Sequence, residues 1–293
     1  MRLISFIGIS MSFFFAVSPV HSNSIPEEIP TEASDTFQQG CNAFYHENYQ
    51  KAQQIFENLV EQHPQNAEMV CWLAKSKAFQ LEEKAKRGAS RLTLLPAGRE
   101  IYNLYNKAVE LNPENKRARL GYAIILRDIP ARILGGDLEK AETMLKNLLE
   151  EDPTYYLAYH HLGNLYIHKK DQVDKGITLL KRAVDVAENH DINRYDKQYL
   201  SRTYHAIGKA YLHKKDQPED AIPFFEKTLE MEPDFISGMI DLVDAYQRTN
   251  QKQEANEILG EVASLAKQRE YKYFYDDIRD AAKKLGLENE INL

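Results

Sequence analysis

Apolar residues recur along this 293-residue chain at intervals of three and four for most of its length. This spacing places them on one side of an α-helix, so the pattern predicts amphipathic helices. Short polar stretches with proline or glycine separate the helical segments and indicate turns. A single two-helix hairpin of this kind cannot bury its apolar face alone, so successive hairpins must stack to close a core. Two such apolar sets are Phe44, Tyr49, Ile55, Phe56 and Leu59, and Ile207, Tyr211, Ile222, Phe225 and Leu229.

One five-residue segment, HKKDQ, occurs twice, at residues 168–172 and 213–217. Aligning residues 159–184 with 204–229 gives ten identities in 26 positions, which predicts a repeated supersecondary unit. The lysines suit the last turn of one helix and the aspartate suits the start of the next, because the helix dipole favours cations at its C-terminus and anions at its N-terminus. We therefore interpret the HKKDQ segment as a turn between helices, with a binding motif as the alternative.

The repeated segments carry a longer motif. The first copy reads Y-x2-L-G-x2-Y from Tyr159 and G-x3-L from Gly176. The second reads Y-x2-I-G-x2-Y from Tyr204, A-x3-F from Ala221 and a proline at Pro233. This pattern resembles the tetratricopeptide-repeat family, whose unit of about 34 residues has W-x2-L-G-x2-Y, A-x3-F and a closing proline. The resemblance implies an all-α protein, a right-handed α-solenoid of about six antiparallel helix pairs with a C-terminal capping helix.

Parts of the same motif recur along the rest of the chain, with longer connections in the second and third pairs. Residues 270–288 are expected to form the capping helix, because a terminal repeat needs a cover for its apolar face. Residues 23–32 are expected to form a flexible segment before the repeats. The six helix pairs are predicted at 33–66, 67–115, 116–155, 156–190, 191–235 and 236–269.

Two insertions lengthen the connections. Residues 81–99 are rich in lysine, arginine and leucine, and we interpret them as a lengthened helix, a break at Pro96 and a restart. Their basic side is either a solvated surface or a contact for a partner. In the second insertion, Ile-Pro at 129–130 is expected to end one helix and Gly-Gly-Asp at 135–137 to restart the next. This loop is similar to one in exported bacterial tetratricopeptide-repeat proteins of unassigned role.

The first 22 residues have the features of a secretory signal peptide. Arg2 is followed by an apolar run from Leu3 to Val17, and a helix of that length rises only about 22 Å, short of a hydrocarbon core of roughly 30 Å. The run therefore favours a signal peptide, residues 1–22, over a membrane span. We expect a periplasmic or secreted protein with no stable membrane span after signal cleavage.

Composition and motifs exclude several classes of function. The chain is 43% hydrophobic with a formal net charge of −7, so it lacks the basic excess of a nucleic-acid-binding protein. It contains no Gly-rich phosphate loop, no G-x-S-x-G, no H-E-x-x-H and no paired C-x-x-C. We therefore predict no enzymatic activity, no cofactor and no metal site. A hydrolase built from residues distant in sequence is the last-ranked alternative.

Polar side chains recur at four-residue spacing in the fourth and fifth pairs, which places them on one face of each first helix. The family resemblance implies that this face lines the concave groove in which such proteins hold ligands. Imidazole, amide and ammonium donors suit carboxylates, so we expect contact with an acidic or C-terminal segment of a partner, strengthened at mildly acidic pH. The predicted peptide-binding row is His160, Asn164, His168, Arg202, His205, Lys209 and His213, continued by Asp244 and Arg248.

The corresponding positions near the N-terminus are apolar and aromatic. Phe37, Phe44 and Phe79 are expected to seat a hydrophobic anchor of the same peptide. Cys41 and Cys71 lie among them on neighbouring predicted helices, and whether they form a disulfide is left open.

The sequence therefore predicts an exported, non-enzymatic scaffold that binds a protein or peptide partner in its concave groove. The alternative is a small-molecule- or lipid-binding accessory subunit of an envelope system, with the aromatic end of the groove as its pocket. An enclosed apolar cavity would favour the alternative, and an open, charged groove would favour the scaffold.

Overall fold

The structure, a computed structural model, describes residues 28–129, 135–190, 194–269 and 271–287. The expected signal peptide, residues 1–22, lies outside this part of the chain. Every regular element among the described residues is helical and none is a strand, so the all-α prediction is confirmed. The elements are η1 (Thr31–Ala33), α1 (Ser34–Tyr45), α2 (Tyr49–Gln62), α3 (Ala67–Lys86), α4 (Arg91–Leu111), α5 (Lys116–Asp128), α7 (Leu138–Glu151), α8 (Tyr156–Lys169), α9 (Val173–Glu188), α10 (Arg194–Lys209), η2 (Ala210–Lys215), α11 (Pro218–Met231), α12 (Ile236–Arg248), α13 (Lys252–Gln268), η3 (Lys272–Phe274) and α14 (Tyr275–Leu285).

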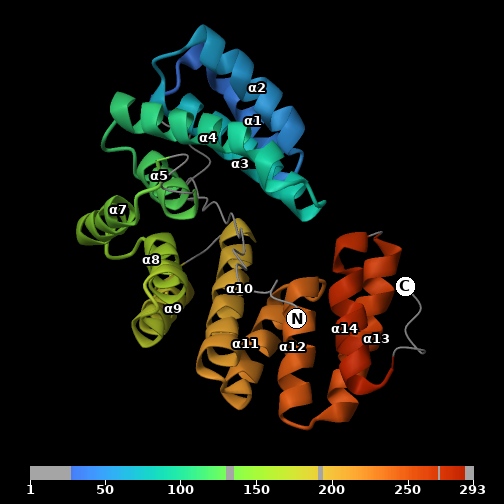
Figure 1. Cartoon of the computed structure of the whole chain (residues 1–293). Helices are drawn as coiled ribbons and strands as arrows, with labels where there is room; N and C mark the ends of the chain where they lie inside the picture. The colour runs from blue at the N-terminus through green and yellow to red at the C-terminus, as the bar shows by residue number, and fades with distance from the viewer. Residues whose placement is uncertain (1–27, 130–134, 191–193, 270, 288–293) are drawn as a thin grey trace. The chain divides into compact units, whose positions relative to one another are not determined.

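The helices pack in consecutive pairs (Figure 1). Helix α1 packs on α2, α3 on α4, α8 on α9, α10 on α11 and α12 on α13. In the remaining pair, Lys140 of α7 places its ammonium group 4.8 Å from the centre of the Tyr122 ring of α5. Helix α14 packs against both α12 and α13. These are the helix pairs and the capping helix that the sequence predicts.

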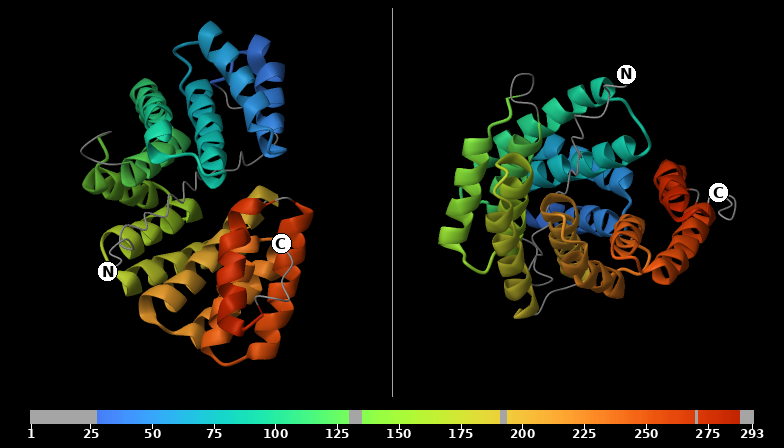
Figure 2. Two further views of the ribbon diagram at one scale, coloured as in Figure 1. Left: turned by 45° about the vertical axis from the view of Figure 1, so that its right-hand side comes forward. Right: turned by 60° about the horizontal axis from the view of Figure 1, so that its bottom comes forward.

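The chain divides into two compact units, an N-terminal unit of Met1–Met144 and a C-terminal unit of Leu145–Leu293. Within each unit a helix also packs on the first helix of the next pair, as α2 does on α3 and α11 does on α12. Figure 2 shows these neighbours from two further directions. Each unit is therefore a stack of hairpins stabilised by contacts between nearest neighbours.

Polar side chains fix where five helices begin. Each accepts a hydrogen bond from a backbone N–H in the first turn, which satisfies one of the donors that a helix start leaves without a partner. Such a cap contributes about 1 kcal/mol to helix stability. The capping residues are Asn48 for α2, Asn66 for α3, Ser90 for α4, Asn115 for α5 and Asp137 for α7.

The first insertion differs from its prediction in one respect. Helix α3 is lengthened to 20 residues as expected, but the break falls at Gly88, whose φ is +86°, and at the Ser90 cap. The predicted break at Pro96 is wrong, because α4 continues through this residue. The missing proline N–H leaves the carbonyl of Leu92 without its helical partner, and Leu92 is 79% exposed, so water can satisfy that carbonyl. In the second insertion, α5 ends and α7 begins as predicted, while residue 130 lies outside the described part.

Both HKKDQ segments form the turn between the helices of their pair. Asp171 and Asp216 each have a left-handed φ of +53°, and the N–H of the next residue donates to the carbonyl of Tyr166 at 2.9 Å or Tyr211 at 3.0 Å. The interpretation of HKKDQ as a turn between helices is therefore supported, although the aspartate lies in the turn and does not begin the next helix. The copies also differ, because the helix before the second turn ends in a π-helix, η2.

Close packing of helices explains the glycine in each repeated motif. A Cβ atom on Gly163 would lie 2.9 Å from the carbonyl oxygen of Gly176, and one on Gly208 would lie 2.6 Å from the Phe225 ring. Real Cβ atoms do not approach other atoms so closely, so these positions accept only the hydrogen of glycine.

Gly208→Ala is expected to lower the free energy of unfolding by about 1–3 kcal/mol, because the added methyl group displaces the Phe225 ring. Gly260→Ala is the matched control inside α13, where no atom lies within 4 Å of the added Cβ. This control is expected to gain up to about 1 kcal/mol from helix propensity. Urea denaturation followed by circular dichroism measures both changes. Equal effects would contradict the packing explanation for Gly208.

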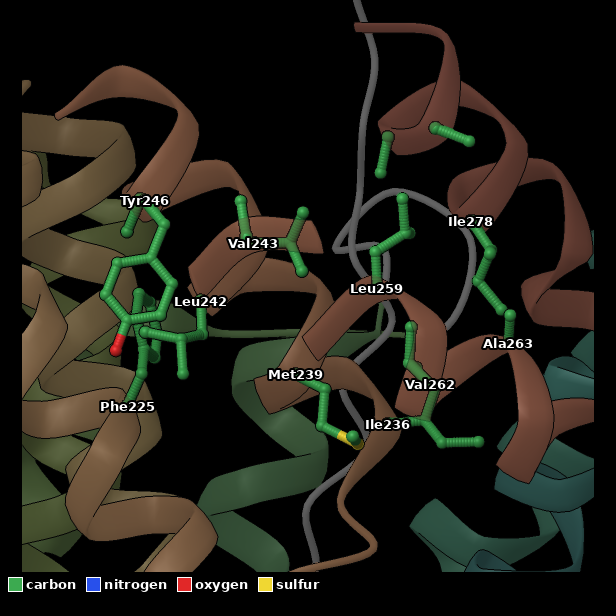
Figure 3. Packing of buried hydrophobic residues seen from close by; sticks show 14 of the residues in the cluster. Phe225, Ile236, Met239, Leu242, Val243, Tyr246, Leu259, Val262, Ala263 and Ile278 are labelled. Carbon is green, nitrogen blue, oxygen red and sulfur yellow. The ribbon is translucent and has the colours of Figure 1, made fainter. Parts of the chain in front are cut away.

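The core of the C-terminal unit fixes α12 and α14 relative to each other. Figure 3 shows Phe225 of α11, Met239 of α12, Leu259 of α13 and Ile278 of α14 among the residues that pack there. These side chains are all buried. Because one face of α12 and one face of α14 are used in this core, their other faces are free to carry polar side chains.

Candidate functional site

Helices α10, α12 and α14 of the C-terminal unit, with the end of η3, line a hollow of about 350 Å³, here called the α10–α12–α14 pocket. Most of its lining side chains are polar or charged. The lining residues are Lys209, Ser237, Ile240, Asp241, Asp244, Gln247, Phe274, Asp277, Asp280, Ala281 and Lys284.

Helical periodicity explains why these side chains gather. On α12 the lining residues follow Ser237 at intervals of 3, 4, 7 and 10 residues, which defines one helix face. On α14 they follow Asp277 at intervals of 3, 4 and 7 residues. The buried face of each helix holds the other in place, with Met239 on α12 and Ile278 on α14 (Figure 3). The pocket is therefore supported by a packed core.

Two histidines of the fifth pair hold one carboxylate of α12. His205 Nε2 lies 2.8 Å from Asp241 Oδ2, and His213 Nε2 lies 3.1 Å from Asp241 Oδ1. An ionised carboxylate only accepts hydrogen bonds, so both ring nitrogens donate. His213 belongs to the π-helix η2, and π-helical turns are rare in proteins and often occur at functional sites. Both oxygens of Asp241 are therefore occupied by side chains of the chain itself.

Burial and these hydrogen bonds set the charges of the pair. Burial alone would raise the pKa of the Asp241 carboxyl, but the hydrogen bonds from His205 and His213 outweigh it and hold this pKa far below its usual value. Burial lowers the pKa of His205, and its hydrogen bond to Asp241 offsets only part of that effect. Asp241 is therefore ionised near neutral pH, and His205 is neutral with its hydrogen on Nε2.

Asp244 is also compensated by cations of the chain. Its carboxylate lies 3.2 Å from Arg248 Nη2 and 3.6 Å from Lys284 Nζ. Arg248 in addition donates to the carbonyl of Leu212 at 3.1 Å and to Asp216 at 3.0 Å. This arginine ties α12 to η2 and to the second HKKDQ turn.

The acids of α14 are less compensated. Within the described residues, no ion pair reaches Asp277 or Asp280. Burial raises the pKa of Asp277, and the carboxylates of Asp280, Asp276 and Asp241 raise it further. The α14 side of the pocket therefore carries negative charge that the described cations do not pair with.

A second polar cluster lies between α8 and α10. His160 Nδ1 is 2.9 Å from Thr203 Oγ1, whose hydroxyl donates to the carbonyl of Tyr199 at 2.8 Å. This series of hydrogen bonds assigns the ring hydrogen to Nδ1 and leaves Nε2 to accept from Asn164 Nδ2 at 2.9 Å. The His160 side chain is buried, so the cluster joins two helices and does not face a pocket.

Comparison with known proteins identifies the repeated hairpin. The fold is similar to the crystal structure of TTC0263, a thermophilic TPR protein in Thermus thermophilus, with a TM-score of 0.55 and 19% identity over 72% of this chain and 97% of that chain. Residues 37–76, 156–190 and 212–278 match models of the tetratricopeptide repeat. The chain is a tetratricopeptide-repeat protein.

Other relatives of this tetratricopeptide-repeat protein are more distant or match in part. A similarity to the crystal structure of the APC/C hetero-tetramer Cut9–Hcn1 has a TM-score of 0.67 with 15% identity, over 86% of this chain and 42% of that chain. The Homo sapiens interferon-induced protein with tetratricopeptide repeats 2 is 26% identical over 141 residues, which is 48% of this chain and 27% of the relative. The chain thus spans about a quarter of the length of this curated relative. Tetratricopeptide-repeat proteins generally mediate protein–protein interactions as scaffolds and are typically non-enzymatic.

The structure of this tetratricopeptide-repeat protein brings three predicted groove residues together. His205 and His213 bind Asp241, and Lys209 lines the same pocket. The prediction expects these donors to receive the carboxylate of a partner, but the chain supplies that carboxylate from α12. The charge expected for this part of the groove is therefore corrected from basic to mixed with an acidic excess.

The other members of the predicted row lie elsewhere. His160 is 2% exposed and bonded to Asn164 and Thr203, so it does not present a free imidazole to a groove. His168 is exposed at the end of α8. Arg202 is partly buried, with its guanidinium carbon 5.7 Å from the centre of the Tyr199 ring. Peptide contact by these residues stays a prediction.

The predicted aromatic anchor seat is part of the core of the N-terminal unit. Phe37, Phe44 and Phe79 are all buried. The ring centre of Phe44 lies 5.5 Å from that of Trp72 and 4.9 Å from that of Phe79, both in edge contact. The expectation of an open aromatic groove is corrected for these residues, because they fill the space between the helices and pack against each other.

Sequence reasoning missed the contribution of α14. Asp277, Asp280 and Lys284 line the pocket, and Phe274 adds an aromatic ring to it. The polar spacing of three and four residues along this helix was the available signal. The prediction uses only the apolar stripe of the same helix, which covers the last repeat.

The described part of the tetratricopeptide-repeat protein offers little support for other kinds of site. No group of three His, Cys, Asp or Glu residues there is arranged to hold a metal ion. Cys41 and Cys71 are free and buried, and burial raises the pKa of each thiol to about 12. No helix in these residues is both long and apolar enough to cross a bilayer.

Lowering the pH is expected to destabilise the C-terminal unit through His205 and Asp241. The folded-state pKa of His205 lies below its usual 6.5, so its stabilising contribution is complete above that pH and is lost as the pH falls through the folded value. The folded-state pKa of Asp241 also lies below its usual 3.8, so this contribution is lost at still lower pH. Both groups therefore lower the stability of the fold as the pH falls.

Denaturant titrations at about pH 7.5, 6 and 5, followed by circular dichroism, measure this loss. His205→Gln keeps an N–H donor for Asp241 but cannot be protonated, so it is expected to lose less stability over this range than the wild type. A wild-type protein that becomes more stable toward pH 5 would contradict the assignment of a neutral, buried His205.

Proposed function

We propose that this protein is an exported, non-enzymatic scaffold that binds a protein or peptide partner at the α10–α12–α14 pocket. The observation that carries the proposal is the pocket itself, which three helices of successive repeats line with side chains of mixed polarity. Its support from known proteins is that tetratricopeptide-repeat proteins generally mediate protein–protein interactions. Export rests on the signal features of residues 1–22.

The size and chemistry of the pocket favour a partner's side chains over a lipid. A hollow of about 350 Å³ is near the lower end of the usual range for ligand sites, about 300–1,000 Å³. Lipid and drug-like ligands need mainly apolar walls, whereas this pocket has four aspartates and two lysines among its lining residues. The aromatic residues on which a lipid pocket would depend are packed into the core of the N-terminal unit.

Site-specific photo-crosslinking tests the place of binding. A crosslinking amino acid at Ser237, a partly buried lining residue, is expected to capture a discrete protein partner from the native envelope fraction. The matched control carries it at Gln253, which is exposed on the neighbouring helix α13. The same captured bands from both positions, or none from Ser237, would contradict a partner site in the pocket.

Export is tested separately on the full chain expressed in a bacterial host. The mass of the purified protein is expected to correspond to cleavage near Ser22, and the protein is expected in the periplasmic or extracellular fraction. An intact N-terminus on a protein confined to the cytoplasm would contradict this part of the proposal and leave the pocket unaffected.

A further inference from the structure

We propose that the α10–α12–α14 pocket takes the cationic side chain of a lysine or arginine in a basic segment of the partner. This inference rests on the proposed function, because it assigns the chemistry of the ligand at the same site. It reverses the charge that the sequence predicts for the partner.

The charge of the pocket favours a cationic ligand. The pocket has four aspartates against two lysines. Asp241 is satisfied by His205 and His213, and Asp244 is paired with Arg248 and Lys284, as described above. The carboxylates that remain available are Asp277 and Asp280, both on α14, and no ion pair reaches either within the described residues. A cation placed between them would remove the mutual repulsion of these acids.

The shape and polarity of the pocket favour the same kind of ligand. The pocket is not a simple acidic surface, because Ile240, Phe274 and Ala281 also line it. Lysine and arginine bury an aliphatic stem while their charged end seeks an acceptor, so they match a hollow with apolar walls and carboxylates. The Phe274 ring offers a further attraction for a cation that lies over its face. A free metal ion would use none of these apolar walls.

The electrostatic field of the unit that contains the pocket also favours a basic ligand. The C-terminal unit has 21 lysines and arginines against 27 aspartates and glutamates, so it carries −6 of the chain's formal net charge of −7. An acidic field of this kind attracts basic partners and speeds their association at low ionic strength. Acidic partners are repelled by the same field.

The raised pKa of Asp277 supports this assignment and gives it a pH dependence. The carboxylates of Asp276, Asp280 and Asp241 face Asp277 and disfavour its charged form. A bound cation favours that form, so ligand binding and ionisation of Asp277 strengthen each other. Protonation of His205, which is hydrogen-bonded to Asp241, would make the same pocket less negative. Basic ligands are therefore expected to bind more weakly as the pH falls toward 5.

The test uses short acetylated and amidated alanine peptides that carry lysine, glutamate or glutamine at the same positions. Isothermal titration with the full-length protein at low ionic strength is expected to show binding of the lysine peptide alone. Asp277→Asn combined with Asp280→Asn is expected to lower its affinity about tenfold or more, the effect of losing roughly 1.4 kcal/mol of attraction.

A double variant of equal charge serves as the control. Asp174→Asn combined with Glu230→Gln removes two carboxylates that are 85% and 68% exposed and do not line the pocket. This variant is expected to change the affinity by less than about threefold, because both carboxylates lie outside the pocket and salt screens charges at a distance. Equal losses from both double variants would overturn the assignment to the pocket.

The other outcomes separate this inference from the proposed function. Preferential binding of the glutamate or glutamine peptide would overturn the cationic assignment and leave a partner site in the pocket. Binding of none of the three peptides would also overturn the cationic assignment. The crosslinks from Ser237 would then decide whether the proposed function is correct. Circular dichroism of each variant checks that the fold is intact, which is expected because the substituted acids are exposed residues of α14 and, in the control, of α9 and α11.

Discussion

Replacing Phe225 by alanine is expected to lower the free energy of unfolding by about 3–5 kcal/mol, through the C-terminal unit. The side chain is 0% exposed. Its ring fills the space above Gly208, where a Cβ atom would lie 2.6 Å away, and its centre lies 5.7 Å from that of the His205 ring. Removing the ring leaves a cavity beside Gly208, and the cost increases with the volume that the surrounding helices do not close.

The single tryptophan of the chain, Trp72, allows this test to distinguish unfolding of the two units. Trp72 lies in the N-terminal unit, so its fluorescence reports unfolding there, whereas circular dichroism reports all helices. We expect Phe225→Ala to shift the dichroism transition more than the fluorescence transition, since repeat proteins couple mainly nearest neighbours. Phe224→Ala, which removes a partly exposed ring stacked on Tyr211, is the control and is expected to cost less than about 2 kcal/mol. Equal losses for the two variants would contradict the role of Phe225 in the core.

Helix pairing was predictable from the sequence because it depends on local features. Three features act within one hairpin. They are the apolar spacing of three and four residues, the repeated HKKDQ turn and the glycine of the repeated motif. Gly163 illustrates this, since its contact with the Gly176 carbonyl lies inside a single pair. The error at Pro96 also concerns local features. Proline disfavours a helix interior, but the Ser90 cap and exposure of the preceding turn let α4 continue.

The candidate site was only partly predictable because it depends on which helix faces which. His205, Lys209 and His213 are found by repeat spacing, and they do meet near the pocket. The identity of their acceptor is decided by α12, which lies one pair further on and contributes Asp241. The acids of α14 required knowledge that this helix turns a polar face toward α12. Helix spacing gives the face of each helix but does not give the charge of the hollow between them.

The two histidine clusters differ for a similar reason. His160 and His205 occupy the same place in the repeat, 45 residues apart, and both are buried. His160 meets Thr203 of α10, whereas His205 meets Asp241 of α12. The same motif residue therefore closes a neutral network in one pair and supports a charged pocket in the next. The difference is set by the neighbouring pair and not by the motif itself.

Glu68→Ala is expected to destabilise the N-terminal unit by about 3–5 kcal/mol, the usual cost of breaking a buried ion pair from one side. Glu68 is 3% exposed and forms an ion pair with Arg117. It also accepts hydrogen bonds from Trp72 Nε1 at 3.0 Å and from Asn115 Nδ2 at 2.8 Å. Removing it leaves the buried indole N–H of Trp72 and the part-buried amide of Asn115 without their carboxylate, and Arg117, whose side chain is 11% exposed, loses this ion pair.

Trp72 fluorescence measures this loss directly, because its indole nitrogen is bonded to the carboxylate that is removed. Glu100→Ala is the control, since Glu100 pairs with Lys77 at 3.0 Å but is 54% exposed, and the expected cost is below about 1 kcal/mol. Glu68→Gln keeps the shape and one acceptor oxygen, so its loss should lie between the two. If Glu68→Ala were no more costly than Glu100→Ala, the network that joins α3 to α5 would add nothing to stability, and apolar packing between these helices would account for it.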